Sequence, residues 1–162
     1  MMKYIQTFFI LWASLFLLAA CAVKEYEKNE SSLIIIKTPK LKFADLGFIR
    51  KNRDQVRVEL FTAGQVVQSI EINHFVCVDD GCLSKSVFNK EYLHSSYPDE
   101  LLLNVLLARP IFEKASLKKT EKGFIQNLKS TEYNITYKIE NGNIYFKDKK
   151  NRLLIKISKT KG

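Results

Sequence analysis

The sequence predicts a mainly β domain of the α+β class: a curved antiparallel sheet or incomplete β-barrel with one or two covering helices, behind a cleaved leader. Three observations predict it. From residue 33 onward, apolar and polar residues alternate over many short segments, a pattern typical of half-buried strands. One apolar segment with helix start and stop signals interrupts them. The first twenty residues have the composition of a secretory signal.

Composition limits the class of protein. The chain has 162 residues, 46% of them hydrophobic, and only three cysteines and six glycines. These values exclude a disordered chain, a disulfide-dense scaffold and a collagen-like repeat. The length predicts one small domain, for which we expect a monomer.

The leader ends in a lipidation signal. Lys3 precedes the uncharged residues 8–20, a run too short to cross a bilayer, which needs about 20 residues. The next residues, Leu18-Ala19-Ala20-Cys21, resemble a bacterial lipobox. We therefore expect cleavage after residue 20 and acylation of Cys21, which makes membrane lipid the first partner. The alternative is an ordinary signal peptide, or an N-terminal membrane anchor with an incidental cysteine.

The expected organisation is a signal peptide (1–20), a lipid anchor with a polar linker (21–32) and a domain (33–162). Ala22 occupies the second mature position. In the sorting rule of enteric lipoproteins an aspartate there retains the protein in the inner membrane, so alanine predicts the periplasmic face of the outer membrane. The chain would be tethered to the bilayer rather than span it.

Cys77 and Cys82 flank a turn sequence that contains Asp79-Asp80-Gly81. In an oxidising compartment this pair predicts a structural disulfide across a hairpin. A metal site with His74 and Asp79, or a cysteine nucleophile beside His74, are the sharper alternatives. We expect neither, because a structural zinc site needs more ligands and a catalytic cysteine needs a free thiolate.

The strands are predicted in order along the chain. Residues 33–36 come first and Pro39 marks a turn; a phase change in residues 41–49 indicates a bulge near Ala44-Asp45. Alternation then predicts strands over 56–60, 70–78, 133–139, 144–146 and 153–157, with a hairpin turn at Asn141-Gly142.

Two helices are expected between these strands. Pro98 begins the clearer one, which has acidic residues in its first turn and ends at Arg109 before Pro110. Because its body is apolar almost all round, it should pack against the apolar face of the sheet. Residues 84–94 predict a weaker helix with a serine cap.

Catalytic motifs are missing from the sequence. His74 falls on the apolar face of the strand predicted over 70–78, so we interpret it as a hydrogen-bonded core residue. His94 is predicted to lie in a loop. We expect no enzyme activity, no metal and no cofactor.

The formal charge of +9 points to an anionic partner. The C-terminal segment is strongly basic, and its expected basic surface consists of Lys147, Lys149, Lys150, Arg152 and Lys156; residues 37–57 are basic as well. An envelope location makes nucleic acid an unlikely ligand, and a solvated face that only confers solubility is the alternative interpretation.

Three segments resemble the LolA/LolB family of lipoprotein carriers and outer-membrane receptors. They are Val56 to Gln65, similar to a family strand and turn; Tyr97 to Phe112, similar to an acidic-start helix ending at proline; and Tyr133 to Ser158, similar to the closing strands. The resemblance implies an incomplete barrel with an apolar cavity for acyl chains, whose ligand would be a lipoprotein's acyl chains or a soluble lipoprotein carrier.

The resemblance also implies site residues. The expected cavity lining is Phe48, Val58, Leu60, Ile70, Ile72, Leu102, Leu106, Ile135, Tyr137, Phe146 and Ile155, although each could equally be plain core. The receptor's membrane-active loop carries an exposed leucine, and here Val66 or Val67 would take that place. The resulting hypothesis is a receptor-like lipoprotein that helps localise lipoproteins or lipids. Its alternative is a tethered adaptor with a packed core whose basic face binds lipopolysaccharide, membrane or an envelope complex.

Overall fold

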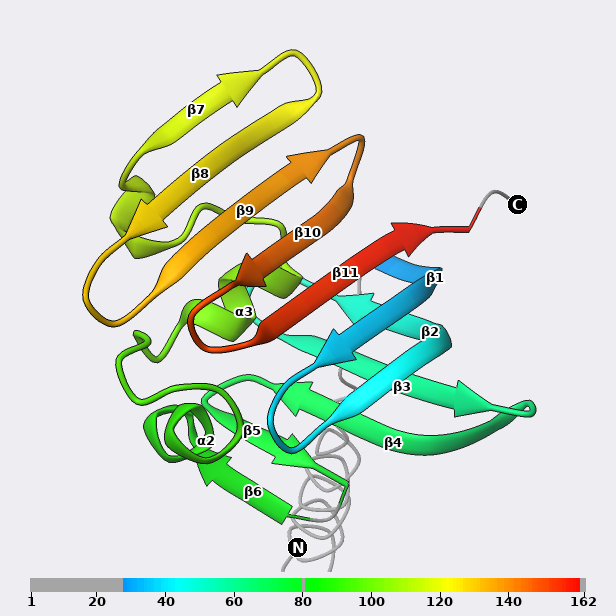
Figure 1. Ribbon diagram of the computed structural model, residues 1–162. Helices are drawn as coiled ribbons and strands as arrows, with labels where there is room; N and C mark the ends of the chain where they lie inside the picture. The colour runs from blue at the N-terminus through cyan, green and yellow to red at the C-terminus, as the bar shows by residue number, and fades with distance from the viewer. Residues whose placement is uncertain (1–27, 80, 161–162) are drawn as a thin grey trace, which may run out of the picture.

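The computed structural model describes residues 28–79 and 81–160, which form one antiparallel sheet of eleven strands with two short helices (Figure 1). In chain order the strands are β1 (Lys28–Lys37), β2 (Lys42–Lys51), β3 (Val56–Thr62), β4 (Gln65–Ile72), β5 (Phe75–Val78), β6 (Gly81–Ser84), β7 (Leu117–Thr120), β8 (Gly123–Lys129), β9 (Asn134–Glu140), β10 (Asn143–Asp148) and β11 (Leu153–Lys159). Between β6 and β7 lie α2 (Lys85–Tyr92), α3 (Leu101–Leu106) and the 3₁₀ turn η1 (Phe112–Lys114).

The predicted α+β class is wrong, because the described chain is nearly all β. Its helices α2 and α3 contain 8 and 6 residues, too few to cover a sheet of eleven strands. The helix expected from Pro98 to Arg109 is limited to Leu101–Leu106, with turns on both sides. In addition, residues 117–129 form β7 and β8, which the alternation did not reveal.

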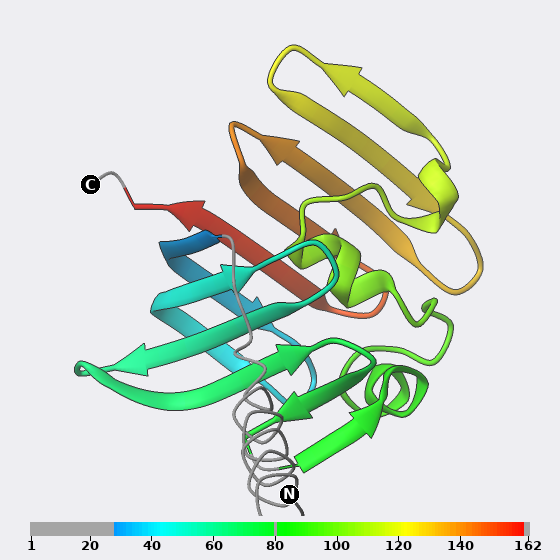
Figure 2. The same ribbon diagram turned by 180° about the vertical axis from the view of Figure 1, so that it is seen from behind.

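The first and last strands are neighbours in the middle of the sheet. The strand order is β6-β5-β4-β3-β2-β1-β11-β10-β9-β8-β7, so β6 and β7 are the two edges. β1 pairs with β11 from Ser32 opposite Lys159 to Lys37 opposite Leu154. The sheet bends, and α3 lies on its concave side (Figure 2).

The concave face holds the core, and the alternating residues of β3, β9, β10 and β11 point into it as predicted. Fully buried side chains there include Ile34, Val58, Leu60, Ile135, Tyr137 and Phe146. Asn141 and Gly142 have positive φ values of 51° and 76° and form the predicted hairpin turn between β9 and β10.

Two local expectations on strands are wrong. Residues 70–78 form parts of β4 and β5, separated by a turn at Asn73 and His74. β2 contains no bulge at Ala44-Asp45, because it pairs with β1 without interruption. The register shift lies instead between Leu60 and Phe61. The phase change in β2 arises because Leu46 and Phe48 lie on the outer, convex face.

The sheet begins earlier than predicted. β1 begins at Lys28, so residues 28–32 belong to the sheet and not to the expected linker.

Ser84 caps α2, since its Oγ accepts a hydrogen bond from the Val87 N–H at 3.4 Å. This agrees with the predicted serine cap. Within residues 28–79 and 81–160, no helix is sufficiently long and apolar to cross a bilayer.

Candidate functional site

Helix α3 lies on the concave face of the sheet with an almost wholly buried surface. All its residues except Asn104 are buried. The Tyr137 hydroxyl from β9 donates to the Val105 carbonyl at 3.4 Å. An apolar segment that is buried on most sides is stable only when both the sheet and neighbouring elements cover it. α3 therefore occupies the space that the sheet encloses.

Two small gaps lie beside α3, and Leu102 and Ile155 border both. The larger has a volume of about 30 Å³ and is lined by Ile36, Thr38, Leu41, Val58, Ile70, Phe88, Tyr92, Leu93, Leu102, Leu106 and Ile155. The smaller has a volume of about 10 Å³ and is lined by Thr38, Leu93, Leu101, Leu102, Val105, Phe146, Leu153 and Ile155. Ligand cavities usually measure about 300–1,000 Å³. In this conformation the side chains of α3 fill the interior.

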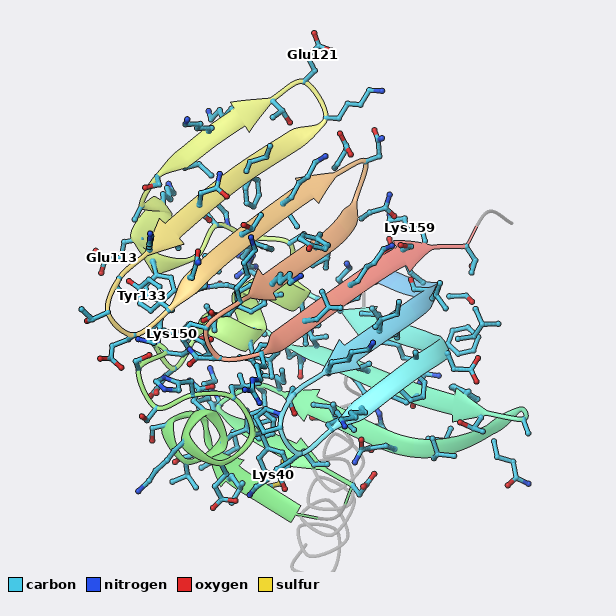
Figure 3. All side chains as sticks on the ribbon, viewed as in Figure 1. Lys40, Glu113, Glu121, Tyr133, Lys150 and Lys159 are labelled. Atoms are coloured by element: carbon cyan, nitrogen blue, oxygen red, sulfur yellow. A yellow bond between two sulfur atoms is a disulfide. The ribbon has the colours of Figure 1, made fainter. Side chains whose placement is uncertain are left out.

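The outer end of the larger gap lies between the β1–β2 turn and α2. Lys40 from the turn places its ammonium 4.9 Å from the centre of the Tyr92 ring and 3.5 Å from the Glu91 carboxylate. Figure 3 labels Lys40 on this turn. These exposed contacts connect the turn to α2 across residues that border the gap, and each contributes little free energy.

The segment that carries α3 is held mainly by polar contacts at its ends. The Asn89 side-chain amide donates to the carbonyls of Tyr97 and Pro98, at 3.3 and 3.1 Å. The Arg109 guanidinium donates to the Arg53 carbonyl. Between these contacts, apart from the long Tyr137 bond and the salt bridge from Lys85 to Glu100 at the start of the helix, apolar packing holds the helix.

Tyr97, just before α3, is fixed to the β10–β11 turn. Its hydroxyl donates to Asp148 Oδ2 at 2.5 Å and accepts from the Asn151 amide at 3.1 Å. Burial and the Asp148 carboxylate raise the pKa of Tyr97 well above its usual range. Burial alone would raise the pKa of Asp148, but hydrogen bonds from Tyr97 and from the backbone of Asn134, Asn151 and Lys150 outweigh it and lower that pKa.

An open polar cleft of about 890 Å³ lies on the other side of α3 and is lined by Asn52, Arg53, Asp54, Gln55, Asn73, His74, Lys85, Glu100, Leu103, Asn104 and Arg109. Lys85 and Glu100 form a salt bridge of 2.6 Å there. His74 is exposed in the β4–β5 turn, so the expectation of a core histidine is wrong. His94 lies in the loop after α2, where its Nδ1 is 2.7 Å from Ser96 Oγ.

The described residues contain no group of three or more histidine, cysteine or acidic side chains arranged to hold a metal ion. The cleft also pairs no serine, threonine or cysteine with its histidine. Its charged side chains could contact a polar ligand, whereas the apolar gaps could receive only hydrocarbon.

The expected cavity residues separate into three groups. Val58, Ile70, Leu102, Leu106 and Ile155 line the larger gap, and Phe146 lines the smaller one. Leu60, Ile72, Ile135 and Tyr137 are buried elsewhere in the core. Phe48 lies on the convex face and packs on Phe61, so its expected place in the cavity is wrong. Without the expected bulge in β2, its side chain points outward.

The remaining expected site residues lie away from α3. Cys77 and Cys82 are paired across β5 and β6, with their sulfur atoms at a disulfide distance of 2.05 Å. Val66 and Val67 are exposed at the start of β4. Lys149, Lys150, Arg152 and Lys156 are exposed and Lys147 is half-buried; Figure 3 shows Lys150 at the β10–β11 turn. Cys21 lies outside the described residues.

Sequence reasoning missed the Tyr97–Asp148–Asn151 cluster. Its members are separated by 51 and 3 residues, and no local motif connects them. Asp148 stands among lysines in the sequence, a pattern that predicts only a charged surface. The position of Tyr97 just before the predicted helix was the single available signal.

Comparison with known proteins gives no family assignment: no protein-family model, curated protein or solved structure significantly matches the chain.

Proposed function

We propose that the protein is a LolB-like, lipid-anchored lipoprotein of the outer membrane that binds acyl chains between α3 and the concave face of the sheet. The observation that carries the proposal is the pair of apolar gaps around Leu102, beneath a six-residue apolar helix. The expected lipobox at Leu18–Cys21 and the resemblance of the α3 segment to the receptor family support it.

Binding requires α3 to move, because the gaps are too small for a chain. Full exposure of the five buried side chains of α3 would cost roughly 8–15 kcal/mol, at about 1.5–3 kcal/mol each. A buried acyl chain of about sixteen carbons gains about 12 kcal/mol, at about 0.8 kcal/mol per methylene. The two terms are similar, so the ligand could replace α3 side chains in the core at little net cost.

The contacts around α3 are compatible with such a displacement. Its polar contacts lie mostly at the two ends of the segment, so the helix body can shift while the ends stay attached. The exposed Lys40 contacts at the outer end of the larger gap are weak enough to open. Val66 and Val67, on the β3–β4 hairpin, would then contact the membrane during transfer.

The test is uptake of a fluorescent fatty acid by the purified full chain in the absence of vesicles. We expect saturable binding. Leu106→Ala enlarges the larger gap and should increase affinity, even though the lost packing lowers the free energy of unfolding by about 2–5 kcal/mol. Leu102→Glu and Leu106→Glu should abolish uptake.

The matched control is Ile144→Ala, since Ile144 is buried in the same core but lines neither gap. It should lose comparable stability and leave affinity unchanged. Near-ultraviolet circular dichroism would check that the glutamate variants remain folded. Absence of saturable uptake by both the wild type and Leu106→Ala would refute acyl-chain binding.

The packed interior favours a second candidate. If α3 does not move, the protein is a tethered adaptor whose basic face binds an anionic envelope component. The gap volumes of about 30 and 10 Å³ support this candidate. The Leu106→Ala experiment separates the two, because an adaptor gains no fatty-acid affinity from a larger gap.

A further inference from the structure

The convex face of β1–β4 carries an apolar surface, which we call the outer patch: the exposed Leu33, Leu46, Phe48 and Val66 and the half-buried Phe61. Leu33 and Leu46, 41% and 50% exposed, are paired directly on β1 and β2. Phe48 packs edge-on against Phe61 at 5.4 Å between ring centres, and Phe61 pairs with Val66. Exposed apolar surface of this kind on a soluble domain commonly marks an interaction site.

A cationic depression lies at the end of β1, where Lys37 is four residues along the strand from Leu33 of the outer patch. This basic hollow has a volume of about 410 Å³ and is lined by Lys37, Lys147, Lys149, Arg152, Asp148, Leu153 and Leu154. The Asp148 carboxylate is occupied by Tyr97, Asn151 and backbone N–H groups. None of the four cations forms a salt bridge with another residue of the described chain. The hollow therefore has an unneutralised positive charge.

The β sheet connects the two features. Lys37 of the hollow lies on the strand that carries Leu33, and it pairs with Lys42 on the strand that carries Leu46. On the far side of the patch two cations are neutralised by two carboxylates: Arg50 and Arg57 each lie 3.2 Å from Glu59, and Arg57 also lies 3.9 Å from Glu71. Free positive charge is thus concentrated at one end of the apolar patch.

We propose that this convex face docks on an anionic membrane surface, with lipid phosphates in the basic hollow and the outer patch among the upper acyl chains. A bilayer surface has charged headgroups above hydrocarbon chains. The lysines of this face suit the headgroup layer, and its aliphatic and phenyl side chains suit the hydrocarbon below. The lysines would attract anionic headgroups. The proposal rests on the proposed function only in that the lipid anchor holds the domain at the membrane.

The tether is long enough for this orientation. Seven residue steps separate Cys21 from Lys28, and they span at most about 25 Å when extended. Leu33 lies five residues farther along β1, about 17 Å at the usual strand rise. The face can therefore reach the bilayer that holds the anchor.

The test places a tryptophan in the outer patch of the lipid-anchored protein. Trp12, the single tryptophan of the sequence, lies in the leader that is expected to be cleaved, so the probe Leu46→Trp would be the one tryptophan of the mature chain. The protein is reconstituted in vesicles with brominated acyl chains, which quench tryptophan at short range. We expect strong quenching with phosphatidylglycerol and weak quenching with phosphatidylcholine alone, and loss of the anionic effect at high salt.

Two controls make the result specific. Val87→Trp places the probe at an exposed apolar position on α2 and should be quenched weakly in both lipids. Lys37→Gln combined with Lys147→Gln should reduce docking about 25-fold, at about fivefold for each lysine near the surface. Lys90→Gln, on the exposed side of α2, should leave docking unchanged.

Three outcomes would overturn the proposal. The first is equal quenching of the probes at positions 46 and 87, and the second is quenching that does not depend on lipid charge. The third is burial of the position-46 probe in a dimer without vesicles, because a second copy of the chain would then cover the patch. The fatty-acid uptake test uses no vesicles. Lost quenching with intact uptake therefore removes the docking proposal alone, and lost uptake with intact quenching removes the acyl-binding function alone.

Discussion

Tyr97 and Asp148 attach the segment that precedes α3 to the sheet. They join a loop between β6 and β7 to the end of β10 through one short hydrogen bond of 2.5 Å. Asp148 is fully buried and accepts further bonds from Asn134, Lys150 and Asn151. A buried carboxylate is tolerated when its oxygens are satisfied in this way.

Tyr97→Phe should lower the free energy of unfolding by about 1–3 kcal/mol, because it removes a partner from a buried carboxylate. Urea denaturation measures the change. The matched control is Tyr145→Phe on the convex face, where we expect a change below about 0.5 kcal/mol. Equal effects of the two variants would show that the Tyr97 hydroxyl has no special role.

The lowered pKa of Asp148 predicts a specific pH dependence. Hydrogen bonding favours the charged carboxylate in the folded state, so its folded pKa lies below the unfolded value of about 3.9. The contribution of the Asp148 carboxylate to the free energy of unfolding is complete above the unfolded pKa. It is lost as the pH falls through the folded pKa. As the pH falls below about 4, wild-type stability should therefore fall more steeply than that of Asp148→Asn. Parallel profiles would contradict this.

Within residues 28–79 and 81–160, the β5–β6 hairpin is the element that a disulfide fixes covalently. Cys77 and Cys82 face each other across the two strands, and Ser84 at the end of β6 caps α2. The disulfide therefore constrains the segment that leads into the helix beside the larger gap.

Cys77→Ser combined with Cys82→Ser should lower the free energy of unfolding by about 2 kcal/mol, as expected for closure of so short a loop. Urea denaturation under non-reducing conditions measures this. A reductant should destabilise the wild type similarly and leave the double variant unchanged. Alkylation of both thiols in protein taken from the periplasm would show that the bond does not form there.

The elements also show what sequence patterns can and cannot predict. Val56, Val58 and Leu60 alternate strictly with polar residues, so both the strand and its buried face could be predicted. In β2, Leu46 and Phe48 are apolar but exposed, and alternation cannot distinguish a strand with two apolar faces from a bulge. The predicted start of the helix is wrong because Pro98, Asp99 and Glu100 are start signals, whereas the helix begins at Leu101 in its tertiary context. The Tyr97–Asp148 contact depends on chain positions far apart, which no local pattern contains.

At the scale of the whole molecule, the anchor and the domain are expected to act together. If Cys21 is acylated, the mature protein should fractionate with the outer membrane, and its mass should show the lipid. Cys21→Ser should remove the lipid from the measured mass, because the thiol that carries the acyl chains is gone. A wild-type mass without lipid would contradict a lipid anchor.

The pairing of β1 with β11 at the centre of the sheet has a consequence for how the chain folds during synthesis. The residues of β1 are made long before those of their partner β11. Until residues 153–159 arrive, the row Leu33 to Ile36 has an open hydrogen-bonding edge, which can recruit other chains. Such non-local topology predicts slow folding, in the millisecond-to-second range, so the nascent domain should depend on holding chaperones more than its small size suggests.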